Sequence, residues 1–230
     1  MTHGVEIEVM STVAFKDAYL ELLPAFECRS GHKVVTQWVP TVEVLRRING
    51  GEAVDLVLMA ASGIEELTRA GKIVGGSAVP FVKSGIGIAA PAGAPAPDVS
   101  STAAFKHTLL AARSIAYSTG PSGNYLAGLF ERIGIAAGIK AKTQIIQGIP
   151  VGDVVARGDA EIGFQQIPEI LPVKGIQYLG PLPADIQYTT LFAAGIHVAA
   201  KQAQAAQAWV DFLKTPAAAA LYKKFGMEPG

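Results

Sequence analysis

Serine, threonine and glycine residues recur where strand-like runs of the sequence give way to helix-like runs. Their side-chain O–H groups, together with the backbone N–H groups of a helix start, hold anions without a full positive charge. These turns contain Ser11 and Thr12, Thr41, Ser62, residues 118–123, and Gly148 with Ile149. Each hydroxyl has a structural alternative, because serine and threonine commonly cap the helix that they precede. The recurrence of the pattern, rather than any single residue, predicts an anion-binding site.

The turn at residues 118–123, with the sequence STGPSG, is the richest of these in glycine and hydroxyl groups. It lacks the G-x-x-x-x-G-K-[ST] pattern of nucleotide-binding loops, and no lysine directly follows Gly123. Nucleotide hydrolysis is therefore not indicated. The turn either presents backbone N–H groups to an anion, with Ser122 as a donor, or is a structural turn with Pro121 near a helix start.

Two neutral amides, Gln165 and Gln166, follow Phe164 at the end of a run that is typical of a buried strand. Amides are unusual in that position. They either turn toward a ligand as hydrogen-bond donors or bond the backbone of a neighbouring loop. The sequence leaves both alternatives open.

The sequence offers no constellation typical of covalent or metal-dependent catalysis. It has no G-x-S-x-G motif, and its four histidines lie far apart at positions 3, 32, 107 and 197. The one cysteine, Cys28, excludes an internal disulfide and multi-cysteine metal sites, and its helical context predicts a small core residue. We expect no catalytic residue, no metal and no cofactor.

The composition narrows the possible partners. The chain of 230 residues has 19 Lys and Arg against 19 Asp and Glu, so it has no basic field to hold nucleic acid. Hydrophobic residues make up 50% and charged residues 17%, which excludes disorder. The most apolar uncharged stretch, residues 84–97, is too short to span a membrane, so we expect a soluble chain. Residues 1–9 contain no secretory leader, so the protein either stays in the cytoplasm or has lost a leader.

Short β-rich runs alternate with helical periodicity, which is typical of βαβ units and a mostly parallel sheet. Strands are expected at residues 5–10, 33–39, 55–59, 85–90, 114–117, 143–147, 160–165 and 187–196. Helices are expected after Ser11 and Thr12, after Thr41 and after Ser62, and at residues 105–112, 125–133, 151–157, 203–213 and 217–224. The hydroxyls are the predicted N-caps of the first three helices, and Ser62 with Glu65 fits a capping box.

This order of elements brings the hydroxyl-bearing turns to common sheet edges, because ligands bind outside the carboxyl ends of parallel strands. A break in helical periodicity at residues 75–97 separates two sets of α/β units. We predict an α/β fold of two lobes, residues 1–83 with 192–230 and residues 84–191. Each lobe is a mostly parallel sheet flanked by helices, and two hinge crossings leave a cleft between the lobes.

Several segments, taken in order, resemble a known family. They are VMST at residues 9–12, VLRRINGGEAVDLV at residues 44–57, PSG at residues 121–123 and VARGDAEIGF at residues 155–164. In this order they are similar to the periplasmic solute-binding proteins of ABC importers, and in particular to the molybdate-binding proteins, which are type II periplasmic binding proteins.

The resemblance implies a Venus flytrap of two lobes that captures a small anion in the interlobe cleft by hinge closure. It also implies a periplasmic location and an ABC permease as the membrane partner, and we expect a monomer. In that family, hydroxyls and backbone N–H groups hold a tetrahedral oxyanion. By position, these contacts fall on Ser11 or Thr12, on Thr41, on Ser122, and near Gly148 and Ile149.

One position departs from the molybdate binders of this family, which have a tyrosine where Gln166 aligns. Amide donors and a roomier cleft suit a small di- or tricarboxylate, with Lys83 or Trp38 at its edge. We therefore expect a non-enzymatic binding protein for a molybdate-like oxyanion or a small organic di- or tricarboxylate. The alternative is an enzyme on the same scaffold that acts on an organic acid, since the fold alone does not exclude catalysis.

Overall fold

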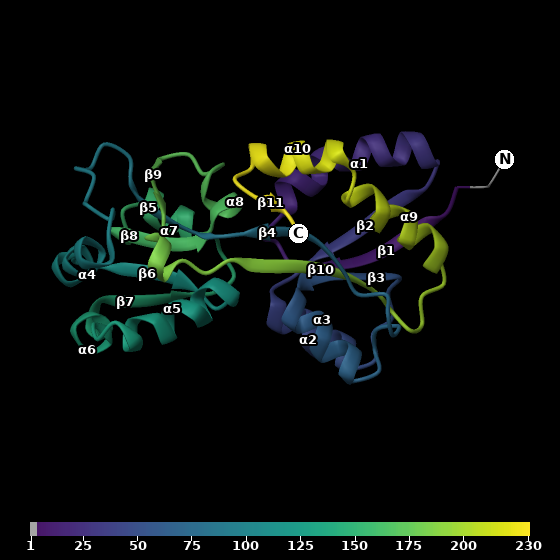
Figure 1. Ribbon diagram of the computed structural model, residues 1–230, viewed down its shortest axis with the longest axis horizontal. Coiled ribbons are helices and arrows are strands. Elements are labelled where there is room, and N and C mark those ends of the chain that lie inside the picture. Colours follow the sequence, from purple (N-terminus) through teal and green to yellow (C-terminus); the bar gives the residue numbers. More distant parts are fainter. Residues whose placement is uncertain (1–3) are drawn as a thin grey trace. The chain divides into compact units, whose positions relative to one another are not determined.

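The computed structural model describes residues 4–230 (Figure 1). Contacts within the chain divide it into two compact units, Met1–Lys83 with Leu191–Gly230, and Ser84–Thr190. The second crossing lies one residue before the predicted one. His3 and the first residues considered for a leader lie outside the described part of the chain.

The first unit contains a six-stranded sheet in the order β11-β4-β10-β3-β1-β2. Three strands are parallel, namely β1 (Glu6–Ser11), β2 (Lys33–Trp38) and β3 (Leu56–Ala60). β10 (Thr190–Ile196) runs antiparallel to β3, and β11 (Glu228–Pro229) runs antiparallel to β4 (Val79–Ser84). The sheet is mixed rather than mostly parallel, because the returning part of the chain adds antiparallel strands to it.

Helices cover both faces of this sheet. One face carries α1 (Lys16–Ser30), α9 (Ala203–Leu213) and α10 (Pro216–Lys224), and the other carries α2 (Thr41–Asn49) and α3 (Ala61–Arg69). β1 shows the alternation that this requires, because Val9 packs into the cluster under α1 whereas Met10 packs into the cluster under α2.

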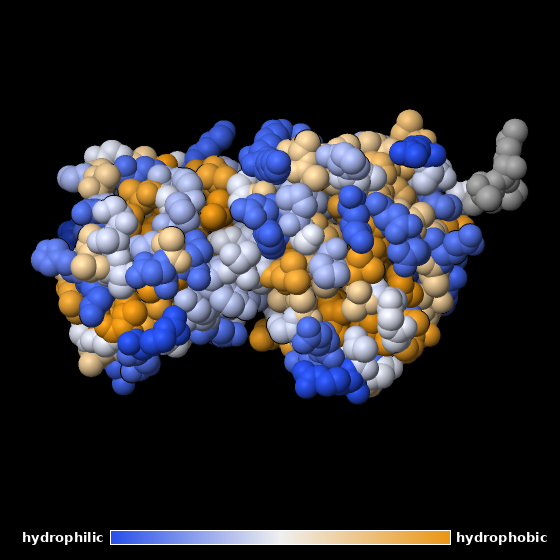
Figure 2. Space-filling view, in the orientation of Figure 1, coloured by the Kyte–Doolittle hydropathy of each residue, from blue (hydrophilic) through white to orange (hydrophobic). Residues whose placement is uncertain are grey.

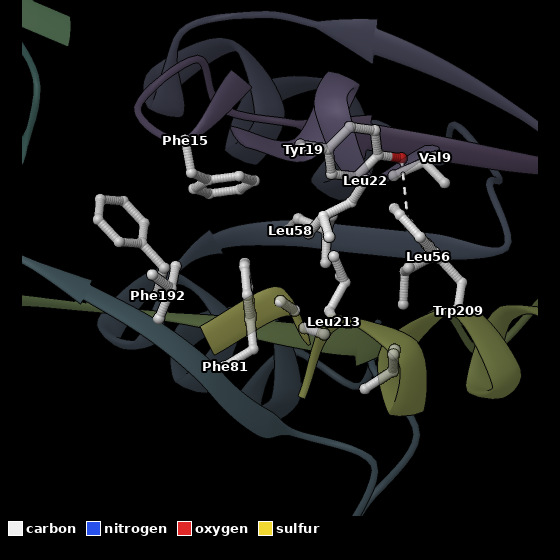
Figure 3. Close-up of a cluster of buried hydrophobic side chains, with 14 of the residues drawn as sticks. Val9, Phe15, Tyr19, Leu22, Leu56, Leu58, Phe81, Phe192, Trp209 and Leu213 are labelled. Carbon is white, nitrogen blue, oxygen red and sulfur yellow. Dashed lines mark hydrogen bonds between the residues drawn. The ribbon is translucent and has the colours of Figure 1, made fainter. Parts of the chain in front are cut away.

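An aromatic cluster anchors α1 on the sheet (Figure 3). Phe15 packs edge-on against Phe81 and Phe192, with ring centroids 5.1 and 5.3 Å apart. The Tyr19 hydroxyl accepts a hydrogen bond from Trp209 Nε1 at 3.1 Å (Figure 3). These contacts fix the first turns of α1 against the sheet and against α9.

The second unit contains a five-stranded sheet in the order β7-β6-β8-β5-β9. β6 (Ile115–Ser118), β7 (Thr143–Ile146) and β8 (Ile162–Gln166) are parallel, whereas β5 (Ile86–Pro91) is antiparallel to β8 and to β9 (Ile176–Pro181). One face carries α4 (Thr102–Ala111), α5 (Pro121–Arg132) and α6 (Ala136–Ile139), and the other carries α7 (Val151–Ala156) and α8 (Ile167–Ile170). Short 3₁₀ turns lie at Lys140–Lys142 and Ala184–Ile186.

The predicted cap of α1 by Ser11 or Thr12 is wrong. α1 begins only at Lys16, and its N-cap makes no side-chain hydrogen bond. The reason is that β1 continues through Ser11, after which the Thr12 N–H donates to the Leu58 carbonyl oxygen at 3.0 Å. Both hydroxyls therefore lie at a strand end instead of a helix cap.

The predicted caps at Thr41 and Ser62 are also wrong. Thr41 is the first residue of α2, because Pro40 in an extended conformation occupies the N-cap position. α3 begins at Ala61, so Ser62 lies inside its first turn, and no side chain caps either helix. The two hydroxyls thus keep their hydrogen-bonding capacity.

Hydrophilic and apolar residues are interspersed on the face shown in Figure 2. No helix among residues 4–230 combines the length and the apolar character needed to cross a bilayer. Cys28, predicted to be a core residue, is exposed. α1 buries Phe26, and a position two residues further along a helix points well away from the buried side.

Candidate functional site

The carboxyl edge of the parallel strands in the first unit gathers four predicted site residues. Ser11 ends β1 and lies in register with Trp38, the last residue of β2. Thr12 follows Ser11 directly, Thr41 begins the helix after β2, and Ser62 lies in the first turn of the helix after β3. Parallel strands present the starts of the following helices at one edge, so these residues share that edge.

Thr12 has the least satisfied hydroxyl at this edge. Thr12 is 5% exposed, and its Oγ1 has no hydrogen-bond partner among the described residues. The neighbouring Ser11 is fully buried, and its hydroxyl donates to the Thr12 carbonyl oxygen at 3.0 Å. A buried hydroxyl without a partner costs about 1–3 kcal/mol, which a ligand oxygen would recover.

The start of α2 adds backbone donors beside these hydroxyls. The first N–H group that bonds back to the turn is that of Glu43, which donates to the Pro40 carbonyl oxygen at 2.9 Å. The N–H groups of Thr41 and Val42 therefore have no partner within their own helix. Thr41 is half-buried and Ser62 is exposed, so both hydroxyls are accessible to a bound molecule.

In the second unit, the turn between β6 and α5 presents another set of backbone donors. Pro121 begins α5 and has no N–H group, and the Asn124 N–H donates back to the Gly120 carbonyl oxygen at 3.0 Å. The N–H groups of Ser122 and Gly123 therefore have no partner within the helix. This geometry suits the predicted role of Ser122 as a backbone donor, which stays a prediction.

Gly123 sets the shape of this turn. A Cβ at Gly123 would lie 1.6 Å from the Ser118 carbonyl oxygen, far inside any contact distance. Only glycine therefore allows the end of β6 to come this close to α5. The Ser118 hydroxyl accepts a weak hydrogen bond from the Gly120 N–H at 3.4 Å, which holds the other side of the turn.

Gln165 bonds the protein with both ends of its amide. Its oxygen accepts from the Val151 N–H at 2.8 Å, and its nitrogen donates to Glu169 Oε1 at 2.6 Å. This amide bonds neighbouring parts of the protein, as in the second alternative, but its partners lie at the start of α7 and in α8 rather than in a loop. Gln165 is 5% exposed, and the bond to Glu169 uses one of the two N–H groups of its amide, so at most one N–H group remains for a ligand.

Gln166 is 2% exposed and also bonds the protein with both ends of its amide. In the orientation that satisfies both ends, the nitrogen donates to Ser84 Oγ at 3.1 Å and to the Gly85 carbonyl oxygen at 3.2 Å, and the oxygen accepts from Thr190 Oγ1 at 2.8 Å. The amide thus joins the first residues of the second unit to its last. The amide of Gln166 therefore has no free N–H group for the predicted contact with a ligand.

Gly148 and Ile149 lie in the loop between β7 and α7. Gly148 has a φ of 76°, and Ile149 is 47% exposed. The first N–H group of α7, that of Val151, is already bonded to Gln165. A backbone donor from this loop would therefore come from Gly148 or Ile149 themselves, as predicted, and this stays a prediction.

Glu169 is a residue of the carboxyl edge that the sequence analysis missed. It lies in α8, directly after the end of β8. Burial raises the pKa of the Glu169 carboxyl to about 7, against hydrogen bonds from the Gln165 side chain and the Gln166 backbone that favour the charged form. A carboxyl that titrates near neutrality can take up and return a proton. The signal in the sequence was an acid three residues after a buried strand.

Lys16 was missed as well. It is the first residue of α1, and its Nζ lies 5.7 Å from the centroid of the Trp38 ring. The signal was a lysine in the first turn of a helix, where the helix dipole disfavours a cation. Lys83, expected at the edge of the site, pairs instead with Glu228 at 3.3 Å.

The structure gives little support for a metal site or for an anion site in the open pocket of the second unit. Residues 4–230 contain no group of three or more side chains suited to hold a metal ion. An open pocket of about 790 Å³ lies in the second unit, lined by residues 97–100, 179–184, 187 and 189. Its one charged lining residue is Asp98, whose carboxylate repels an anion. None of the predicted site residues lines it.

Comparison with known proteins agrees with the fold and with the predicted kind of protein. An aconitate isomerase from a Pseudomonas species is 34% identical over 229 residues, which cover 97% of this chain and 87% of the relative. The molybdate-binding protein ModA of Azotobacter vinelandii is 27% identical over 238 residues, which cover 97% of this chain and 90% of ModA. The sulfate-binding protein SubI from Mycobacterium tuberculosis shares the fold, with a TM-score of 0.80 at 20% identity over 98% of this chain and 87% of that one.

These matches confirm the predicted two-lobe α/β fold and the resemblance to molybdate-binding proteins. The model of one family, the bacterial extracellular solute-binding proteins, covers residues 7–228 and thus nearly the whole chain. The chain belongs to this family of bacterial extracellular solute-binding proteins.

Proposed function

We propose that this chain is a periplasmic binding protein for a small organic acid with several carboxylates, of the aconitate type. One observation supports the anion site most directly. The Thr12 hydroxyl is buried and has no partner among the described residues. It lies at a strand end next to the unpaired N–H groups at the start of α2. The relative named for aconitate favours a carboxylate as the ligand.

Uncharged donors discriminate between ligands through the donors that a ligand leaves unpaired. The O–H groups of Thr12 and Thr41 in the first unit each require an acceptor oxygen, as do the N–H groups of Ser122 and Gly123 at the predicted donors of the second unit. A ligand that lacks the oxygen for the Thr12 hydroxyl leaves this buried donor unsatisfied, at about 1–3 kcal/mol. Carboxylate oxygens and tetrahedral oxyanions both satisfy such donors.

The Gln166 amide does not contribute to the choice between these ligand classes. Its nitrogen and oxygen are bonded to Ser84, Gly85 and Thr190. The preference for a carboxylate therefore depends on the relative named for aconitate. Molybdate and its analogues form the competing class in the test.

A thermal-shift panel tests the ligand class. The panel contains cis- and trans-aconitate, citrate, molybdate, tungstate, sulfate and phosphate. A ligand at a hundredfold excess over its Kd stabilises the protein by about 2.7 kcal/mol. We expect the tricarboxylates to raise the melting temperature. A rise with molybdate and none with any carboxylate would contradict the proposed ligand class, and no rise with any anion would contradict the anion site.

Thr12→Val is expected to weaken ligand binding about tenfold and to leave the stability of the ligand-free protein unchanged or higher. Valine has the shape of threonine without the O–H group, so only the unpaired hydroxyl is removed. Calorimetric titration and urea unfolding measure the two quantities. Thr12→Ser, which keeps the hydroxyl, is the matched control. Equal losses of binding and of stability in Thr12→Val would indicate a purely structural hydroxyl.

Delivery to an ABC permease, a monomeric state and closure of a cleft on the ligand belong to the same proposal. The family supports them, because solute-binding proteins present a captured solute to a transporter. Ligand contacts made only in a closed state would drive closure. Small-angle scattering with and without citrate and aconitate measures both the oligomeric state and the change in radius of gyration.

Isomerisation of the bound acid is the second candidate function. It is favoured by the relative named aconitate isomerase and by Glu169, whose pKa burial raises to about 7 at the carboxyl edge of the second unit. The Glu169 carboxylate would take a proton from the methylene carbon beside the double bond, and the electron pair would spread over the allylic unit. Returning the proton to the other end of that unit moves the double bond without an oxidant or a cofactor.

Proton NMR of aconitate in D₂O with the protein tests this candidate. Interconversion of the isomers, or exchange of their C–H protons for deuterium, is expected if the chain catalyses the shift. Glu169→Gln should abolish it and leave binding intact, because glutamine keeps the shape but cannot take the proton. Tight binding without any exchange would mean that the chain binds the acid and does not isomerise it.

A further inference from the structure

Lys16 is a half-buried cation without a counter-ion in the described chain. None of the seven ion pairs among residues 4–230 includes it. It is also the first residue of α1, a helix of 15 residues, where the positive end of the helix dipole disfavours a cation. A residue that breaks a local rule and has no counter-ion in the protein is often kept for a functional reason.

The direction of the Lys16 side chain is fixed by Trp38. Its Nζ lies 5.7 Å from the centroid of the Trp38 ring, within the range of a cation–π contact. That ring is held edge-on by Tyr19 of α1, at 5.0 Å between centroids. Trp38 in turn ends β2 in register with Ser11 at the end of β1. The ammonium is therefore held at the carboxyl edge of the parallel strands.

The same edge contains an independent sign of a ligand, the Thr12 hydroxyl. Thr12 is 5% exposed, and its Oγ1 has no partner in the described part of the chain. Thr12 follows Ser11, which pairs with Trp38, so this unpaired donor and the unpaired ammonium belong to one edge. Together they offer one neutral and one charged donor to the same guest.

We propose that Lys16 selects carboxylates at this site by pairing its ammonium with one carboxylate of the bound acid, while Trp38 positions the ammonium. This inference rests on the proposed anion site of the first unit and names the determinant of its ligand class. A multiply charged organic acid gains from a cation that a purely neutral set of donors lacks. A charge-assisted hydrogen bond contributes about twice as much as a neutral one.

A purely structural alternative makes a different prediction. If Lys16 only covers the Trp38 ring, its removal changes stability and leaves ligand selectivity as it was. If it pairs with a carboxylate, its removal weakens tricarboxylate binding and reduces the salt dependence of that binding, because the pair is screened by salt. Binding of molybdate, which neutral donors satisfy, then changes much less.

Calorimetric titrations of Lys16→Met, Lys16→Gln and Lys16→Arg with citrate, trans-aconitate and molybdate at low and high salt test the proposal. We expect the two uncharged variants to lose about 30-fold in tricarboxylate affinity. Lys16→Arg should retain affinity within about threefold, since it keeps the charge. Lys214→Met is the matched control for loss of one positive charge, because Lys214 is exposed and lies at the end of α9.

The outcomes separate this inference from the proposed function. Unchanged tricarboxylate binding in both uncharged variants, with Thr12→Val still weakened, would overturn the role of Lys16 and leave the anion site intact. Wild-type binding of molybdate alone would overturn the selection of carboxylates. Absence of binding by the wild type to every anion tested would overturn the proposed function itself. Melting temperatures without ligand identify a variant that is merely unstable. In that case the binding data of the other uncharged variant decide whether Lys16 has the proposed role.

Discussion

Gly123→Ala is expected to destabilise the second unit by about 3 kcal/mol or more and to weaken anion binding at the proposed donors Ser122 and Gly123. The new Cβ would lie 1.6 Å from the carbonyl oxygen of Ser118 and 2.7 Å from its carbonyl carbon. These are backbone atoms, which cannot move aside as the end of a flexible side chain does. The turn between β6 and α5 must therefore open, and the N–H groups of Ser122 and residue 123 move with it. Urea unfolding and titration with citrate and aconitate measure the two effects.

Gly128→Ala is the matched control in the same helix. Gly128 is exposed, and no atom lies within 4 Å of the Cβ that alanine would add. This change is expected to stabilise the protein by about 0.5–1 kcal/mol, because alanine is the better helix former. Binding should be unaffected. If Gly123→Ala behaved like Gly128→Ala in both measurements, the close approach of β6 and α5 would not matter to the site.

The parallel part of each sheet was predictable because its elements are specified locally. β1, β2 and β3 begin and end within one residue of the predicted positions. β4, β9 and β11 were missed. Each contains a proline, which lowers strand propensity, and each depends on a partner far away in the sequence, as in the pairing of Glu228 with Lys83.

The location of the candidate site was predictable, but the partners of its side chains were not. A serine or threonine near a helix start suits a cap and a ligand donor equally well. At Ser11, the pairing with Trp38 prolongs β1 through this residue, so Ser11 ends a strand and does not cap a helix. At Gln166, the amide bonds Ser84 and Thr190 instead of staying free for a ligand. Only folding brings these distant residues to the amide.

Glu169→Gln is expected to remove a pH dependence of stability that the wild type has. Burial raises the pKa of the Glu169 carboxyl in the folded protein to about 7, from 4.5 without burial. Between these values the folded protein keeps a proton that the unfolded chain has lost. The carboxyl therefore stabilises the fold fully below about pH 4.5, and this contribution is lost as the pH rises through about 7. At about 1.4 kcal/mol per pKa unit, the loss is about 3 kcal/mol.

Urea unfolding of wild type and Glu169→Gln between about pH 4 and pH 8 measures this contribution, because glutamine is neutral throughout. The difference in unfolding free energy, wild type minus variant, should fall by about 3 kcal/mol across the range. Glu27→Gln, with the series extended down to about pH 3, is a control of opposite sign. A hydrogen bond from Lys33 lowers the pKa of Glu27, so its contribution is present above pH 4.5 and lost as the pH falls. Parallel pH profiles for wild type and Glu169→Gln would mean that Glu169 ionises normally, which would also remove the support for proton transfer at this carboxyl.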